Sequence, residues 1–151
     1  MADDREYMQR ALEEAYAAAT ENEVPVGAVL VYEERVIARG HNRMIQRKDA
    51  LAHAELMALQ AAALVHPHKW LLDTTLYVTL EPCLMCAGAL VLARVARVVF
   101  AAADPKAGAL GSTVNVFAEP HVNHRPEVTA GVLADESTAL IKEFFRTLRE
   151  K

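Results

Sequence analysis

Residues 75–86, with the sequence TLYVTLEPCLMC, decide how the chain folds around them. The segment from Thr75 to Thr79 is rich in residue types that favour a pleated strand. Pro82 suits the first position of a helix, because its φ is already helical and that position needs no N–H donor. Cys83 and Cys86 then lie three residues apart on one face of the opening turn. The stretch predicts a strand followed by a helix that carries two thiols at its N-terminus.

These thiols have a chemical partner in the motif His53-Ala54-Glu55. A helix N-terminus carries partial positive charge, which lowers thiol pKa values and favours the metal-binding thiolate. His53, Cys83 and Cys86 supply three ligands of a tetrahedral zinc, the number that catalytic sites use when water takes the fourth position. Glu55 is the natural group to handle the protons of that water. The set predicts a zinc hydrolase rather than a structural zinc site.

The rest of the chain alternates between helical and strand periodicity. Apolar spacing predicts a helix over 3–22, and Glu33-Glu34 is typical of a hairpin turn. Asp49 is predicted to cap a helix over 50–64, with His53 in its first turns. The other predicted segments are strands over 26–31, 35–39, 97–102 and 127–131, loops over 40–48 and 104–112, and a closing helix over 134–149. Strands alternating with helices predict an α/β sandwich with a mixed sheet.

Length and composition limit the class of protein. A chain of 151 residues fits one domain over 1–151. The first six residues are acidic where a secretory signal is basic and then apolar. Arg94 and Arg97 interrupt the most apolar region, 87–103, so it falls short of the roughly 20 apolar residues of a membrane span. We expect a soluble, cytoplasmic protein whose two cysteines form a metal or redox pair.

A net charge of -4 argues against a generally basic nucleic-acid binder. Two local groups of cationic residues would form a basic face if folding brings them together. The spacing is equally compatible with ordinary solvent-exposed charges that bind nothing. The groups are Arg43, Arg47 and Lys48, and Arg125, Arg146, Arg149 and Lys151.

Two alternatives compete with a catalytic zinc site. A redox Cys-x-x-Cys pair leaves the separate His-x-Glu motif unexplained. A structural zinc site normally brings a fourth Cys or His, and no other histidine has a spacing that singles it out. We interpret these as ordinary loop residues, with 66–68 an exposed turn; they are His41, His66, His68, His121 and His124. The helix dipole alone would account for an acidic residue at position 55, near a helix N-terminus. The pairing of Glu55 with His53 distinguishes it from such an ordinary acidic residue.

Several motifs together resemble one family. They are residues 25–31, 52–55, 75–83, 104–109 with 111–112, and 123–125, followed by Phe144-Phe145 in the last helix. His-x-Glu followed by Pro-Cys-x-x-Cys is the signature of zinc-dependent nucleobase deaminases. The longer motifs resemble those of bacterial tRNA-specific adenosine deaminases, in the cytidine and deoxycytidylate deaminase superfamily. The resemblance spans nearly the whole chain and implies a three-layer α/β/α cytidine-deaminase-like fold with a central mixed five-stranded sheet.

The activity that the resemblance implies is hydrolytic conversion of adenosine to inosine at the wobble position of a transfer RNA anticodon. It implies a homodimer with one zinc ion and a catalytic water per subunit. His53, Cys83 and Cys86 then hold the zinc. Glu55 takes a proton from water, delivers one to N1 as hydroxide attacks C6, and later helps to protonate the departing amine. An anticodon loop already splays its bases, which lowers the cost of flipping one into a pocket.

The resemblance also assigns substrate contacts. Asn42, in the family's Gly-x-Asn pattern, is the expected reader of the nucleotide, with Val26 and Ala54 beside it. Without the resemblance, Asn42 is better explained as a turn residue that bonds its own backbone. Helical spacing alone makes at least one residue of Phe144-Phe145 part of the core. The residues expected to contact the flanking nucleotides, or to shape their pockets, are Asp104, Lys106, Asn123, His124 and Phe145.

The chain departs from the family pattern at three places. Residues 49–52 are Asp-Ala-Leu-Ala instead of the common Asp-Pro-Thr-Ala, which removes a stiffening proline. Ser137 stands where a cysteine is often found. The chain ends at Lys151 without the longer basic tail of some members, which weakens nonspecific attraction for RNA.

Two rival functions remain at this stage. A deaminase of a free base or nucleoside, such as guanine or cytosine, uses the same zinc and glutamate, although the flanking motifs disfavour it. A non-catalytic zinc-binding or RNA-binding module is the other, and the presence of Glu55 beside an open metal position argues against it.

Overall fold

The computed structural model describes residues 2–150 and, within them, a mixed five-stranded sheet and four α-helices. The strands lie in the order β2-β1-β3-β4-β5; β1 is antiparallel to both its neighbours and β4 is parallel to both of its own. The strands are β1 Gly27–Tyr32, β2 Arg35–His41, β3 Thr74–Leu80, β4 Arg97–Ala102 and β5 Glu127–Ala130. The helices are α1 Asp4–Thr20, α2 Ala54–Ala63, α3 Leu84–Leu92 and α4 Ala134–Arg149, with a 3-10 turn at Val116–Ala118.

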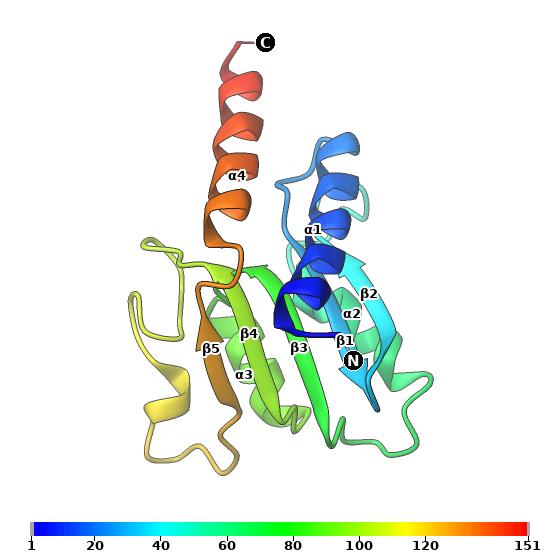
Figure 1. Ribbon diagram of the computed structural model, residues 1–151. Coiled ribbons are helices and arrows are strands. Elements are labelled where there is room, and N and C mark those ends of the chain that lie inside the picture. Colours follow the sequence, from blue (N-terminus) through cyan, green and yellow to red (C-terminus); the bar gives the residue numbers. More distant parts are fainter. Residues whose placement is uncertain (1, 151) are drawn as a thin grey trace.

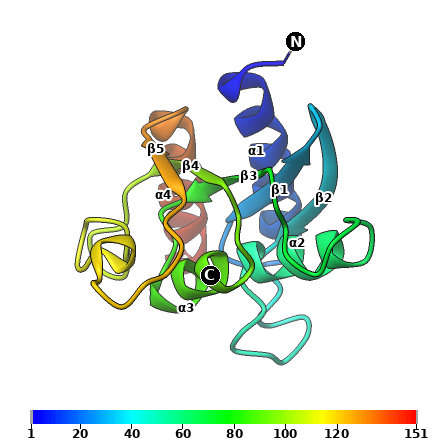
Figure 2. The same ribbon diagram turned by 90° about the horizontal axis from the view of Figure 1, so that it is seen from below.

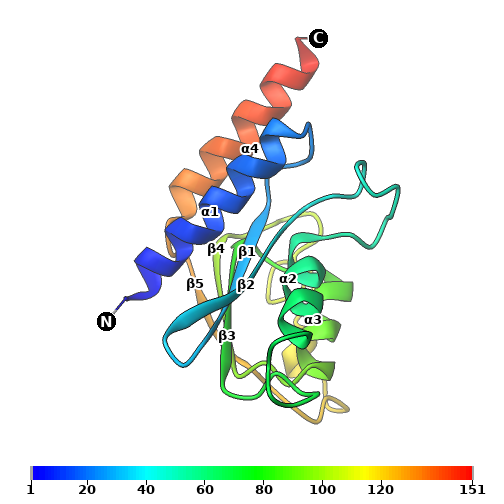
Figure 3. The same ribbon diagram turned by 90° about the vertical axis from the view of Figure 1, so that its right-hand side faces the viewer.

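The helices cover both faces of the sheet, as the side view shows (Figure 3). α1 and α4 lie together on one face (Figure 3), and α2 and α3 pack beside each other on the other (Figure 2). The predicted three-layer α/β/α fold is therefore confirmed. The C-terminal half of α4 extends past the end of the sheet (Figure 1). No helix within residues 2–150 is long and apolar enough to cross a membrane.

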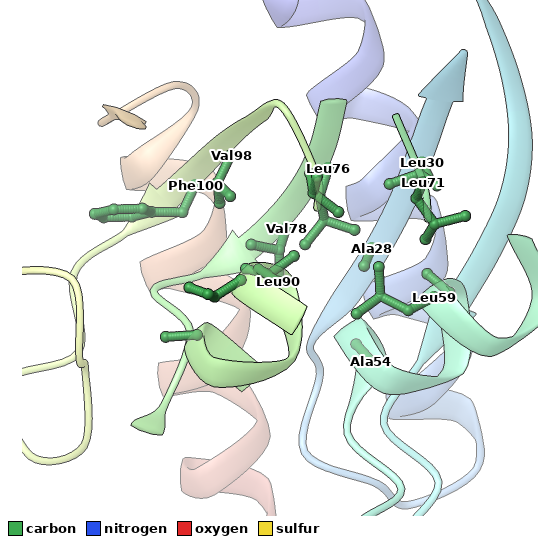
Figure 4. Close-up of a cluster of buried hydrophobic side chains, with 14 of the residues drawn as sticks. Ala28, Leu30, Ala54, Leu59, Leu71, Leu76, Val78, Leu90, Val98 and Phe100 are labelled. Atoms are coloured by element: carbon green, nitrogen blue, oxygen red, sulfur yellow. The ribbon is translucent and has the colours of Figure 1, made fainter. Parts of the chain in front are cut away.

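Each layer boundary has its own hydrophobic core. Successive side chains of a strand point to opposite faces, and both faces of this sheet are covered, so β1 is buried at consecutive positions. Ala28 and Leu30 face α2 and α3, while Val29 and Val31 face α1. The larger core lies under α2 and α3 (Figure 4), and includes Leu59, Leu71, Leu76, Val78, Leu90, Val98 and Phe100.

Two glycines let helices approach the sheet closely. A Cβ at Gly27 would lie 2.1 Å from the carbonyl oxygen of Ala11 in α1. A Cβ at Gly40 would lie 2.5 Å from the backbone nitrogen of Ala58 in α2. Both distances are far below van der Waals contact, so only glycine permits this packing. Gly40 matters for the site, because α2 carries Glu55.

The predicted starts of two helices are wrong. α2 begins at Ala54, not at residue 50, and the Asp49 side chain accepts the N–H of Leu51 in a local turn. α3 begins at Leu84, because Cys83 has an extended backbone and occupies the N-cap position, with Pro82 just before it. Neither N-cap residue, His53 nor Cys83, makes a side-chain capping bond.

The turn predicted to be exposed at 66–68 is partly buried. His66 is 8% exposed, and its Nε2 pairs with the carbonyl oxygen of Leu72 at 3.0 Å. Its ring also packs against Tyr32, with centroids 4.6 Å apart. This histidine belongs to the structural core of the loop after α2.

Candidate metal centre and substrate pocket

Two helix N-termini bring the three predicted metal ligands together. His53 is the N-cap of α2, Cys83 is the N-cap of α3, and Cys86 lies in the first turn of α3. Their ligand atoms all lie within 4.8 Å of one another. His53 Nδ1 is 3.6 Å from the sulfur of Cys83 and 3.6 Å from the sulfur of Cys86.

These distances fit a tetrahedral zinc ion. Bonds of about 2.3 Å to sulfur and 2.05 Å to nitrogen at tetrahedral angles place the two ligand atoms about 3.6 Å apart. Within residues 2–150 the group contains no fourth His, Cys, Asp or Glu. Three protein ligands with an open fourth position are the arrangement of a catalytic zinc site.

The two thiols differ in how readily they lose a proton. Hydrogen bonds with Cys86 and His53 lower the pKa of Cys83 to about 3, so this residue is a thiolate at neutral pH. The hydrogen bond with Cys83, together with burial, raises the pKa of Cys86. A bound cation would favour the deprotonated form of both thiols.

Glu55 lies in the first turn of α2 and is 4% exposed. Burial raises the pKa of its carboxyl group to about 7. A carboxyl group with this pKa can accept and release a proton near neutral pH, which a general acid and base requires. It lies two residues from His53, on the same helix end as the ligand.

A pocket of about 210 Å³ opens beside the ligands. This volume is below the roughly 300–1,000 Å³ of sites for drug-sized molecules, so it suits a single base more than a whole nucleotide. Four predicted substrate residues line it: Val26, Asn42, Ala54 and Asp104. The rest of the lining is Val24, Met44, His53, Glu55, Leu80, Glu81, Cys83 and Ala107.

Asn42 combines the two interpretations that the sequence allowed. It is 7% exposed, and its Oδ1 accepts the N–H of Met44 two residues later, at 3.2 Å, as in a turn. Its Nδ2 donates to the carbonyl oxygen of Val24 at 3.3 Å. Since an amide group has one further donor and one further acceptor site, Asn42 can hold this turn and still bond a ligand.

The remaining predicted contacts lie elsewhere. Lys106 and Phe145 share a separate surface hollow with Arg146 and other residues of α4. Asn123 is exposed, and His124 pairs through Nε2 with the carbonyl oxygen of Val95 at 2.7 Å. In this chain, Lys106, Phe145, Asn123 and His124 are not among the residues that line the base-sized pocket.

Comparison with known proteins places the chain among deaminases. A family model for MafB19-like deaminases matches residues 2–149. A tRNA-specific adenosine deaminase of Bacillus subtilis is 46% identical over 151 residues, covering 100% of this chain and 94% of the relative. One from Agrobacterium fabrum is 44% identical, covering 99% and 98%. The chain belongs to the tRNA-specific adenosine deaminase family. The family predicted from the sequence, and the prediction of an enzyme, are thus confirmed.

Solved structures of deaminases share the fold. One, from a study of A-to-I editing by tRNA:A34 deaminases at the wobble position of transfer RNA, has a TM-score of 0.86 and 44% identity. It covers 89% of this chain and 97% of that one. A guanine deaminase from Nitrosomonas europaea has a TM-score of 0.75 at 26% identity, covering 95% and 85%. Both deaminases share the fold of this chain, but the sequence identity falls from 44% for the tRNA:A34 deaminase to 26% for the guanine deaminase.

Sequence reasoning did not find Glu81, which holds one wall of the deaminase pocket. Its carboxylate accepts the backbone N–H groups of Asp104 at 3.1 Å, Leu110 at 2.9 Å and Ser112 at 3.2 Å, and the Ser112 hydroxyl. Burial alone would raise the pKa of Glu81, but these bonds outweigh it and lower the pKa. A Cβ at Gly108 would meet the same carboxyl group at 2.3 Å. The place of Glu81 directly before Pro82 and Cys83 was the available signal.

Proposed function

We propose that this protein deaminates adenosine to inosine by hydrolysis at the wobble position of a transfer RNA anticodon. The observation that supports this most directly is a base-sized pocket lined by Glu55 and by two of the three clustered ligands, His53 and Cys83, with Cys86 in the same ligand cluster. The full-length relatives at 44–46% identity are named for this activity. The proposal includes a single deaminase domain over residues 1–151. It also places the protein in the cytoplasm, where its substrate is found.

The three ligands would hold zinc through His53 Nδ1 and the two sulfur atoms. When bound, zinc supplies positive charge that lowers the pKa of a water molecule towards neutrality. Glu55 accepts a proton from that water and delivers a proton to N1 of adenine as the oxygen bonds to C6. The bond from C6 to the amino nitrogen then breaks. Glu55 helps to protonate the leaving nitrogen, and the products are inosine and ammonia.

Different residues contact the target nucleotide and the nucleotides beside it. Asn42 bonds the nucleotide, and Val26 and Ala54 contact the base. Nucleotides beside it meet residues outside the pocket, where aromatic and cationic side chains suit single-stranded RNA. These residues are Lys106, Asn123, His124 and Phe145, and Asp104, which lines the pocket itself, meets the same neighbouring nucleotides.

The same proposal includes a homodimer formed through the α2 and α3 face. Isolated exposed apolar residues are ordinary, but this face carries several large ones. Leu84 is 67% exposed and Leu92 is 78% exposed in α3, and Leu64 at the end of α2 is 86% exposed. Leu84 and Leu92 lie eight residues apart, so they share one side of the helix.

The test incubates the purified protein with transfer RNA that carries adenosine at the wobble position, and in parallel with free adenosine, guanine and cytosine. Inosine formed only in the RNA supports the proposal, and turnover confined to a free base overturns it. Glu55→Ala is the matched variant. It should keep zinc and the fold but lose inosine formation; activity close to that of the wild type would refute the role of Glu55.

A further inference from the structure

Glu23 is a buried carboxylate with no part in the chemistry above. It is 1% exposed, yet it lies in the short connection between α1 and β1. Its Oε1 accepts the backbone N–H of Ile45 at 3.1 Å, and its Oε2 accepts the N–H of Gln46 at 2.7 Å. Burying a carboxylate is costly unless it is hydrogen-bonded, so these two amides account for its presence in the interior.

The two amides belong to a helical turn. The N–H of Arg47 donates to the carbonyl oxygen of Arg43 at 2.9 Å, and the N–H of Asp49 donates to that of Met44 at 3.0 Å. The first N–H groups of such a turn have no partner within it, and a carboxylate is a strong acceptor for them. Glu23 therefore caps this turn from a segment about 20 residues earlier in the chain.

The capped turn forms one wall of the pocket. Asn42 and Met44, at its beginning, both line the pocket. Neighbours of Glu23 hold the same strand end, since the N–H of Asn42 donates to the carbonyl oxygen of Val26 at 3.1 Å and its side chain to that of Val24. Glu81 holds the loop over residues 104–112 in the same manner. Each of two loops at the pocket is thus fixed by a buried carboxylate that accepts backbone N–H groups.

We propose that Glu23 is a positioning residue for the substrate base. It fixes the turn over residues 43–47 and so gives Asn42 and Met44 a single placement against the purine. This proposal rests on the proposed deaminase function. Because Glu55 and the metal ligands lie on α2 and α3, a loss of Glu23 should weaken binding of the substrate and leave the chemical step intact.

The experiment compares three full-length proteins on an RNA hairpin that carries adenosine at the wobble position. Glu23→Gln keeps the shape of the side chain but places an amide group against N–H donors. Asp4→Asn is the matched control, a carboxylate-to-amide change at a hydrogen-bonded residue outside the pocket. We expect Glu23→Gln to raise KM about tenfold, as when one charge-assisted hydrogen bond is weakened, with kcat within about twofold and full zinc content. Asp4→Asn should keep both kinetic constants.

The outcomes separate the two proposals. Wild-type protein that forms no inosine in the hairpin refutes the deaminase function itself. With an active wild type, unchanged kinetics in Glu23→Gln overturn the positioning role, and so does a fall in kcat at constant KM. An equal rise in KM for Asp4→Asn would also overturn it, because general destabilisation would then explain the effect. If Glu23→Gln does not fold, Glu23→Asp, which keeps the charge but has a shorter reach, carries the same expectation.

Discussion

At the scale of single residues, the site combines a cluster of potential metal ligands with buried carboxylates that support the pocket walls. The sequence was enough to predict the ligand set His53, Cys83 and Cys86, because zinc accepts few types of side chain and the spacing within each motif is local. The sequence offers no comparable signal for Glu23, and for Glu81 it offers only the place directly before Pro82 and Cys83. Their partners are backbone N–H groups 22 to 31 residues away, and every residue except proline has one. No pattern of residue types can therefore show which amide a carboxylate accepts.

Asp4 provides a prediction on stability and pH. Arg97 donates two hydrogen bonds to its carboxylate, at 2.8 Å and 2.6 Å, and Tyr77 donates one at 2.7 Å. The bonds from Arg97 are the largest cause of a lowered pKa for Asp4 in the folded protein. A lowered folded pKa stabilises the fold above the unfolded pKa of about 3.9, and this contribution disappears as the pH falls through the folded value.

We expect Asp4→Asn to lower the free energy of unfolding by about 1 kcal/mol at pH 7, since the pair is partly screened by solvent. The difference from wild type should shrink as the pH falls below about 4. Urea unfolding at a series of pH values measures it. The exposed pair of Glu143 with Arg146 serves as control, and Glu143→Gln should change little. A difference for Asp4→Asn that grows towards acid pH would contradict this account.

At the scale of elements, the predicted bounds agree with the structure for some helices and strands and not for others. α4 has its predicted bounds, and so does β4. The predicted starts of α2 and α3 were wrong because His53 and Cys83 have extended backbones and each helix begins one residue later. Metal-ligand geometry, rather than capping preference, accounts for the residue types at these two positions.

Gly40 tests whether α2 must touch the sheet. In Gly40→Ala the new methyl group would lie 2.5 Å from the nitrogen of Ala58 and 2.7 Å from the carbonyl oxygen of Ala54. The helix has to move, so we expect a loss of stability of about 3 kcal/mol and of most activity, since Glu55 moves with it. Thermal unfolding and inosine formation measure the two effects. Arg39→Ala, one residue earlier in β2, is the control and should cost little; similar losses in both variants would speak against the close packing.

At the scale of the whole molecule, alternating strands and helices predicted the layers but not the strand order. The hairpin about Glu33-Glu34 was visible, because its turn is local. The central place of β3, between β1 and β4, depends on crossovers through α2 and α3. Those connections pair segments tens of residues apart, which periodicity does not report.

The proposed homodimer gives a prediction at this scale. Leu92→Glu places a charge on the exposed face of α3, so it should convert a dimer into a folded monomer. Sedimentation analysis measures the mass, and circular dichroism checks the fold. Tyr16→Glu changes an apolar residue that is 57% exposed on α1, on the other face of the sheet, and should leave the dimer intact. A monomeric wild type, or dissociation by Tyr16→Glu alone, would refute the assigned face.

The exposed C-terminal end of α4 has a consequence for the affinity of the proposed RNA binding. Every residue from 145 to 150 is exposed, while the first turn is anchored by the hydrogen bond from the Ser137 hydroxyl to the carbonyl oxygen of Thr79. Arg146 steadies these turns through Glu143 and Glu150. A phosphate group that recruits this guanidinium takes it from the two carboxylates. Under the proposed function, RNA binding at this end of the helix would therefore be an exchange of partners, in which Arg146 loses its two ion pairs with Glu143 and Glu150 as it gains a phosphate.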